Sequence, residues 1–165
     1  LPIMIYNIPG RTGINMTAET VKKCAEVPNI VALKEAGGSL EQFIEFRQAA
    51  PIDFQIYSGD DALTLPFITN GGNGVVSVAS HIAGKQIHEM IEAIESGNTN
   101  RANELDAILQ PLFDVLFITS NPIPVKAALK LIGFNCGTTR PPLMSITNDQ
   151  QSDVETIVDA FFEKV

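Results

Sequence analysis

The stretch that decides the fold is residues 30–38, which read Ile-Val-Ala-Leu-Lys-Glu-Ala-Gly-Gly. An aliphatic run closed by glycines is typical of a buried strand that leads into a loop. Lys34 stands at this junction, so we expect its stem in the core and its amine at the rim. Burial disfavours the ammonium, lowers the pKa of the amine and frees a lone pair that can attack a carbonyl. The stretch therefore indicates a Schiff-base lysine, although a strand-end lysine that reaches into solvent fits it too.

The segment upstream predicts a second strand beside the first. Residues 3–6 form a short apolar run that ends at Tyr6, and residues 17–26 have the composition of a helix. Strand, helix and strand over this length form a βαβ unit, whose two strands are parallel and adjacent. We therefore expect Tyr6 and Lys34 to lie side by side at one edge of a sheet.

The loop after the upstream strand adds a cation to this edge. Residues 7–13 contain the proline and glycines of a structured turn, with Arg11 among them. A phenol beside an amine can pass protons, and a guanidinium can hold a carboxylate through paired hydrogen bonds. Each residue also has a structural interpretation: Tyr6 could be a core tyrosine, and Arg11 could pair with a carboxylate on the surface.

Strands and helices continue to alternate up to about residue 97. Valine- and isoleucine-rich runs are typical of parallel strands, and the helical spacing of apolar residues predicts the intervening helices. We expect strands over residues 54–57 and 75–78, and helices over residues 39–50, 62–69 and 82–95. The chain thus has four β-α units, which is half of the eight that close a (β/α)8 barrel.

The pattern changes after residue 97, where the strands stop. Apolar residues at helical spacing predict further helices over residues 100–117, 121–132 and 149–162, with a loop over 138–148. The predicted domains are therefore half of a barrel over 1–97 and a helical domain over 98–165. Because half a barrel leaves sheet edges unpaired, and because the chain starts at Leu1, we expect it to be part of a longer protein.

Composition excludes several classes of function. The apolar share of 45% is ample for a core, and a net charge of −8 without a basic cluster argues against a nucleic-acid surface. Cys24 and Cys136 lack metal-binding spacing and are expected to be reduced. His81 and His88 lack a nearby set of carboxylates, so we expect no metal site. These features indicate a cytoplasmic protein.

Five motifs, in order along the chain, resemble the dihydrodipicolinate synthase family, also called 4-hydroxy-tetrahydrodipicolinate synthase, within the N-acetylneuraminate lyase class of aldolases. The match runs over nearly the whole chain but covers only the C-terminal part of the family. Linked motifs are far more specific than any one alone. They are Tyr6-Asn7-Ile8-Pro9-Gly10-Arg11-Thr12-Gly13, Val31-Ala32-Leu33-Lys34-Glu35-Ala36, Ser58-Gly59-Asp60-Asp61, Gly74-Val75-Val76-Ser77-Val78 and Asn121-Pro122-Ile123-Pro124-Val125-Lys126.

The resemblance implies a class I aldolase on a (β/α)8 TIM barrel with a C-terminal helical domain. Lys34 would form the imine with pyruvate and Tyr6 would transfer protons. Arg11 would organise the carboxylate end of L-aspartate 4-semialdehyde, and Gly59 and Val76 would line the pocket through backbone groups. No metal or organic cofactor is implied, because the imine on Lys34 is the electron sink. The family is commonly a homotetramer that acts in lysine and diaminopimelate biosynthesis.

Other interpretations of the resemblance stay open at this point. Arg11 favours the synthase over its relatives, because the matching position in N-acetylneuraminate lyases is aliphatic. A related pyruvate-dependent aldolase, of the N-acetylneuraminate lyase or 2-keto-3-deoxygluconate type, is the first alternative. The second is a non-catalytic half-barrel, since the family also uses residues from the N-terminal half. Gly59 could then be no more than a tight turn.

Overall fold

The computed structural model describes residues 1–165, which form two compact units, Leu1–Ser77 and Val78–Val165. No helix combines the length and apolar character needed to cross a membrane. The boundary predicted between residues 97 and 98 separates the barrel segment of the chain from the helical domain. The division into compact units is a different property and does not test it. That boundary therefore stays a prediction.

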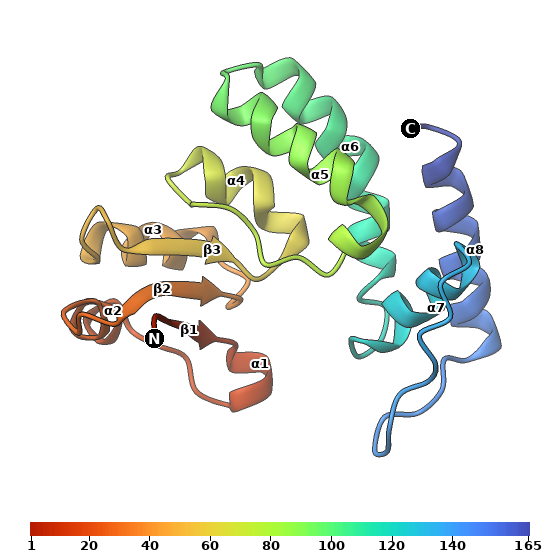
Figure 1. Ribbon diagram of the computed structural model, residues 1–165, viewed down its shortest axis with the longest axis horizontal. Coiled ribbons are helices and arrows are strands. Elements are labelled where there is room, and N and C mark those ends of the chain that lie inside the picture. Colours follow the sequence, from red (N-terminus) through yellow and green to blue (C-terminus); the bar gives the residue numbers. More distant parts are fainter. The chain divides into compact units, whose positions relative to one another are not determined.

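The first unit is built on a parallel sheet in the order β1-β2-β3 (Figure 1). The strands are β1 (Ile3–Asn7), β2 (Ile30–Glu35) and β3 (Gln55–Ser58). Helix α2 (Ala18–Ala25) joins the first pair and α3 (Leu40–Ala49) joins the second. The predicted βαβ arrangement is confirmed.

Side-chain caps explain why both connecting helices begin where they do. The Thr17 side chain accepts a hydrogen bond from the Thr20 amide, and the Ser39 side chain accepts one from the Gln42 amide. Such caps satisfy amide groups that have no partner within the helix. Each helix therefore starts directly after its cap residue, close to the predicted position.

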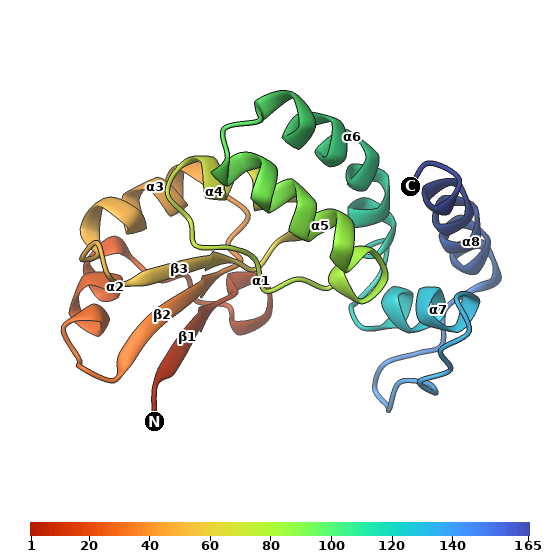
Figure 2. The same cartoon turned by 45° about the horizontal axis from the view of Figure 1, so that its top comes forward.

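Helices cover one face of the sheet, and this face holds the core of the first unit (Figure 2). Leu33 and Ile56, from neighbouring strands, are fully buried against Phe43 and Phe46 of α3 and Phe67 of α4 (Thr64–Thr69). Successive side chains of a strand point to opposite faces. Residues next to Leu33 and Ile56 in the sequence therefore face away from this helix layer.

The predicted fourth strand, residues 75–78, is reduced to a single bridge between Ser58 and Val75. Upstream, Asn73 occupies the edge of β3: its amide donates to Ile56 O and its side-chain Oδ1 accepts from Ile56 N, both at 2.8 Å. At Ile56 a side-chain oxygen replaces the backbone acceptor, so the one bridge forms at Ser58, the last residue of β3. The following residues lie beyond the end of β3 and form no regular ladder.

Two other segments differ from the predictions. Residues 7–13, predicted as a loop, contain the one-turn helix α1 (Pro9–Thr12), because proline suits a first helical turn and Gly13 closes it with a φ of 74°. The predicted helix over 62–69 is divided into a 3₁₀ turn (Asp61–Leu63) and α4.

The second unit consists of four helices: α5 (Ser80–Glu95), α6 (Thr99–Val115), α7 (Ile123–Leu131) and α8 (Asn148–Phe162). Helix α5 packs on α6 and α7, and α8 packs on α6 and α7. Large apolar side chains from these helices are fully buried, among them Met90, Leu109 and Val154. The predicted helices of this part of the chain are confirmed to within a few residues.

Candidate active site

Tyr6 and Lys34 meet at the carboxyl ends of two neighbouring strands. They are register partners in the parallel ladder between β1 and β2, so their side chains leave the same face of the sheet. Lys34 is partly buried, and its Nζ lies 4.3 Å from the centroid of the Tyr6 ring. The juxtaposition expected from the sequence is therefore present.

The face that carries this pair is open within the first unit. It is the face opposite the helix layer, and Met4 and Tyr6 on it are 43% and 46% exposed. An accessible amine can attack a carbonyl carbon, and an adjacent phenol can donate and accept the protons that such an attack requires. The pair therefore has the components of imine chemistry.

Gly59 lies directly against the lysine. A Cβ placed on Gly59 would be 2.9 Å from Lys34 Cε and 2.8 Å from Ala36 Cβ, closer than real Cβ contacts. The Gly59 amide donates to Glu35 O at 2.6 Å, which holds this backbone close to the strand that bears the lysine. A glycine is needed here because only hydrogen leaves room for the lysine stem.

Val76 enters the site through the same series of backbone hydrogen bonds. At the end of each strand, a carbonyl accepts from a residue just beyond the neighbouring strand or bridge: Asn7 O from Ala36, Glu35 O from Gly59, and Ser58 O from Val76. The amide groups of Gly59 and Val76 are thus used within the fold. Their carbonyl groups are the backbone groups left for a ligand.

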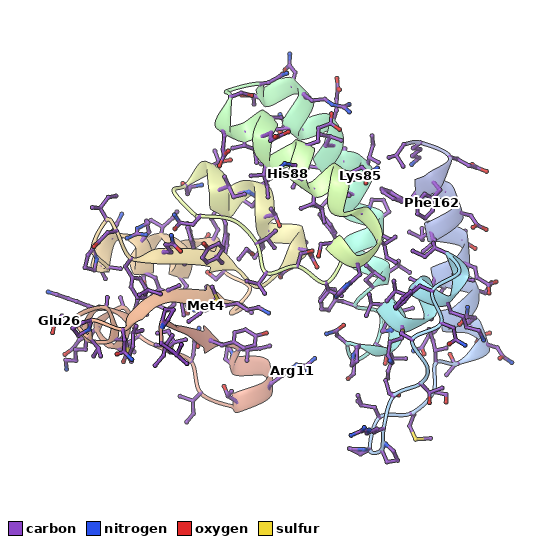
Figure 3. All side chains as sticks on the ribbon, viewed as in Figure 1. Met4, Arg11, Glu26, Lys85, His88 and Phe162 are labelled. Atoms are coloured by element: carbon purple, nitrogen blue, oxygen red, sulfur yellow. The ribbon has the colours of Figure 1, made fainter.

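Arg11 is the outlying member of the predicted set. It lies in α1, directly after β1, where its side chain is exposed and projects from the helix (Figure 3). Tyr6, Lys34, Gly59 and Val76 are joined by the strand ladder and its extensions, whereas Arg11 belongs to the segment that follows it.

Behind the Tyr6–Lys34 pair, on the helix-covered face, lies a buried polar cluster that the sequence analysis did not identify. Glu35 and Asn7, the residues next to the pair, are 0% and 2% exposed. The Glu35 carboxylate accepts from Asn7 Nδ2 at 2.8 Å, from the Gly37 amide at 2.6 Å and from Gln42 Nε2 at 3.0 Å.

Two opposing effects act on the pKa of Glu35. Burial raises this pKa above its usual value, while the hydrogen bonds from Asn7, Gly37 and Gln42 partly offset that rise. The two-residue period of the strands could have identified this acid. If Lys34 faces one side of a buried strand, Glu35 must face the helix layer and needs polar partners there.

Tyr57 was also missed. It is the register partner of Lys34 on β3, so Lys34 lies between two tyrosines along the ladder, Tyr6 on one side and Tyr57 on the other. The Tyr57 hydroxyl donates to Gln55 Oε1 at 2.9 Å. The sequence held a signal for it: Tyr57 is the last residue of the strand predicted over residues 54–57, just as Tyr6 is the last residue of its predicted strand.

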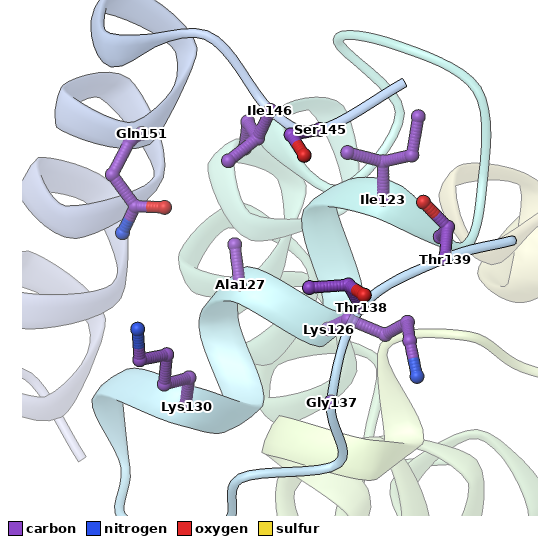
Figure 4. A pocket seen from close by; sticks show the side chains of 10 residues that line it. All are labelled: Ile123, Lys126, Ala127, Lys130, Gly137, Thr138, Thr139, Ser145, Ile146 and Gln151. Atoms are coloured by element: carbon purple, nitrogen blue, oxygen red, sulfur yellow. The ribbon is translucent and has the colours of Figure 1, made fainter. Parts of the chain in front are cut away.

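The second unit contains a separate hollow of about 140 Å³, lined by residues of α7, α8 and the 137–146 loop (Figure 4). Lys126 lines it, but its Nζ donates to Cys136 O at 2.8 Å and so ties the loop to α7. None of the predicted site residues lines this hollow.

Comparisons with known proteins identify the family of this chain. Residues 1–161 match the model of the dihydrodipicolinate synthetase family. The chain is 51% identical over 158 residues to a 4-hydroxy-tetrahydrodipicolinate synthase of Nostoc sp., and 56% identical over 160 residues to one of Desulforamulus reducens. Each alignment covers 96% of this chain and 54% of the relative.

A solved structure gives the same result. The crystal structure of DHDPS (dihydrodipicolinate synthase) from Cyanidioschyzon merolae with lysine bound is similar to this chain with a TM-score of 0.95 and 55% sequence identity. The alignment covers 98% of this chain and 55% of the chain in that crystal structure. The chain thus spans about half the length of the relatives it matches. The chain belongs to the dihydrodipicolinate synthetase family, and its fold is about half of that family's (β/α)8 barrel followed by C-terminal helices.

Proposed function

We propose that this chain contributes the Schiff-base centre of a 4-hydroxy-tetrahydrodipicolinate synthase, a lyase of the class I aldolase type. The reaction condenses pyruvate with L-aspartate 4-semialdehyde in lysine and diaminopimelate biosynthesis. The observation that carries the proposal is the 4.3 Å distance between Lys34 Nζ and the Tyr6 ring at the strand ends. Relatives that are 51% and 56% identical carry the name of this synthase, which supports it over other aldolases.

The proposed chemistry starts with Lys34. Its neutral amine attacks the keto carbon of pyruvate, and loss of water leaves an imine between Nζ and that carbon. Removal of a proton from the methyl group of the protonated imine gives an enamine, whose carbon forms a bond to the aldehyde carbon of the second substrate while the aldehyde oxygen takes up a proton. Attack of that substrate's own amino group on the imine carbon then releases the Lys34 amine. Tyr6 is the proton donor and acceptor for these steps, because its phenol ring lies against the amine.

The remaining predicted residues act on the substrates without covalent chemistry. Arg11 would hold the carboxylate end of the aldehyde substrate through paired N–H donors. Gly59 and Val76 would present backbone carbonyl groups, since their amides serve the ladder. The covalent imine performs the role of an electron sink, so the proposal includes no metal or organic cofactor.

The proposal concerns a protein of the relatives' full length that contains this sequence, called the full-length protein below. In that protein we expect a cytoplasmic homotetramer. The half-length chain alone should be inactive, because its open sheet face cannot exclude water from the imine: Tyr6 is 46% exposed.

Two substitutions in the full-length protein test the assignment. Lys34→Arg should abolish turnover and leave the circular dichroism spectrum unchanged, because a guanidinium keeps the charge but cannot form the imine. Tyr6→Phe should fold normally and lose about a hundred- to ten-thousand-fold in kcat, the range that general acid–base catalysis contributes. Turnover by Lys34→Arg would exclude the proposed nucleophile, and wild-type kcat in Tyr6→Phe would return Tyr6 to a structural role.

A further inference from the structure

We propose that Glu35 is a positioning residue: its buried carboxylate joins the strand end that bears Lys34 to the strand end that bears Tyr6. This inference rests on the proposed function, because it concerns how the imine-forming pair is held. It assigns a catalytic consequence to a carboxylate that does not face the substrate side of the sheet.

Glu35 and Asn7 are themselves register partners, one position beyond the reactive pair. Tyr6 pairs with Lys34 in the ladder, and the next pair is Asn7 with Glu35. Successive side chains alternate between faces, so the reactive pair lies on one face and the Asn7–Glu35 pair lies directly behind it. A displacement of either strand end would therefore move one member of the reactive pair relative to the other.

The hydrogen bonds of Asn7 fix the orientation of its side-chain amide, so that Asn7 is the donor and Glu35 the acceptor. Its Oδ1 accepts from the Met16 amide at 3.0 Å, so its Nδ2 must be the group that donates to Glu35 Oε2 at 2.8 Å. The same Nδ2 donates to Asn15 Oδ1 at 2.8 Å. Asn7 can therefore satisfy Glu35 only if Glu35 offers an acceptor.

The other carboxylate oxygen holds the loop and helix that follow the lysine. Glu35 Oε1 accepts from the Gly37 amide at 2.6 Å and from Gln42 Nε2 at 3.0 Å. The three groups that bond to the carboxylate are thus N–H donors, and none of them is a cation. A buried carboxylate is costly unless its oxygens are satisfied in this way. The cluster links β1, β2, the turn after β2 and α3 at the level of the reactive pair.

This geometry predicts that even the isosteric change Glu35→Gln is poorly accommodated. An amide NH₂ would replace one acceptor oxygen and face either Asn7 Nδ2 or the Gly37 amide. Turning the Asn7 amide would cost its bond with the Met16 amide. The added change Asn7→Asp relieves the conflict at residue 35, because one oxygen of the new aspartate accepts from the introduced NH₂ group while the other keeps the bond with the Met16 amide. The exposed Asn15, whose Oδ1 accepts from Asn7 in the wild type, must then turn its amide so that its NH₂ group faces the aspartate.

The test measures steady-state kinetics and melting temperature in the full-length protein. Glu35→Gln should lower kcat about ten- to a hundred-fold, the effect of misplacing reacting groups by up to about 1 Å, while KM for pyruvate changes less than about threefold. If Glu35→Gln lowers kcat about a hundred-fold, the double variant, Asn7→Asp with Glu35→Gln, should have a kcat at least about tenfold higher than that of Glu35→Gln. Glu45→Gln, the same change at an exposed position of α3, is the matched control and should leave both constants unchanged.

Three results would overturn the inference. These are wild-type kcat in a folded Glu35→Gln variant, a loss that the double variant does not reduce, or a rise in KM with kcat unchanged. If Glu35→Gln does not fold, Gln42→Ala replaces it, since it removes one donor from a partly buried position. We expect a loss of about three- to tenfold in kcat from Gln42→Ala, and wild-type kcat there would also overturn the inference.

Borohydride trapping with pyruvate separates this inference from the proposed function. If wild-type protein does not label at Lys34, the proposed function itself fails. If wild-type protein labels and Glu35→Gln labels at the same rate, only the positioning role of Glu35 fails.

Discussion

Adding one methyl group at Gly59 should displace the Lys34 side chain without replacing any ionisable residue. In Gly59→Ala the new Cβ would lie 2.9 Å from Lys34 Cε, 2.8 Å from Ala36 Cβ and 3.1 Å from Glu35 O. Glu35 O is a backbone atom and Ala36 Cβ is attached directly to the backbone, so neither can move away by a change of side-chain rotamer. The Gly59 amide also donates to Glu35 O at 2.6 Å, which keeps the two segments together. The Lys34 stem is the flexible neighbour and should move, whereas the contact with Ala36 Cβ is relieved only if the backbone shifts.

The size of the effect follows from this crowding. Overpacking a well-packed site costs about 1–3 kcal/mol, and the whole range applies here because movement of the lysine stem leaves the contact with Ala36 Cβ in place. Misplacing a reacting group by about 1 Å can cost about a hundred-fold in rate. Gly59→Ala should therefore lose about 1–3 kcal/mol of unfolding free energy and about ten- to a hundred-fold in the rate of imine formation.

Two assays in the full-length protein measure these quantities. Urea denaturation gives the free energy of unfolding, and borohydride trapping over time gives the rate at which pyruvate labels Lys34. Gly10→Ala is the matched control, because no atom lies within 4 Å of a Cβ at that position, so neither quantity should change appreciably. Wild-type labelling rates in Gly59→Ala would refute the reasoning, because they would mean that the lysine does not need the space beside Gly59.

Three further predictions concern stability and use the chain itself. Phe67→Ala removes a fully buried ring whose centroid lies 4.2 Å from that of Phe43, and it should cost about 3–5 kcal/mol in urea denaturation; a cost below about 1 kcal/mol would contradict the core described here. Thr147→Ala removes the capping box of α8, in which the Gln150 amide donates to Thr147 Oγ1 at 3.3 Å, and should cost about 1 kcal/mol. Unchanged amide-hydrogen exchange in the first turn of α8 would count against that cap. Burial raises the pKa of Glu35 above 4.5, so the unfolded chain loses this proton first as pH rises. The unfolding free energy of the wild type relative to Glu35→Gln should therefore be highest below about pH 4.5 and fall as pH passes the raised value. A difference that stays constant from about pH 4 to about pH 8 would be evidence against the raised pKa.

The predictable part of the fold is the part that local patterns encode. The two strands that carry Tyr6 and Lys34 follow from their apolar runs, and the structure has them, ending one residue further on at Asn7 and Glu35. The prediction of a strand over residues 75–78 was wrong, because a strand there needs a neighbouring strand, β3, that continues beside it. β3 stops at Ser58, and Asn73 already occupies the edge beside Ile56. No property of the Val-rich run itself carries that information.

The candidate site was predictable to a similar extent. Parallel pairing brought Tyr6 and Lys34 together, and the close approach of Gly59 to the Lys34 stem became visible only in three dimensions. The Glu35 cluster was missed because its partners, Asn7 and Gln42, come from other elements. A single sequence does not show which distant amides converge on a buried carboxylate.

The central claim is that Lys34 forms an imine with pyruvate, and reductive trapping tests it most directly. The full-length protein is treated with pyruvate and borohydride, digested, and its peptides are mapped by mass spectrometry, with Lys34→Arg as the control. We predict a reduced pyruvyl adduct on Lys34 in the wild type and no adduct in the variant. An unlabelled wild type, or an adduct on another lysine that persists in Lys34→Arg, would contradict the account.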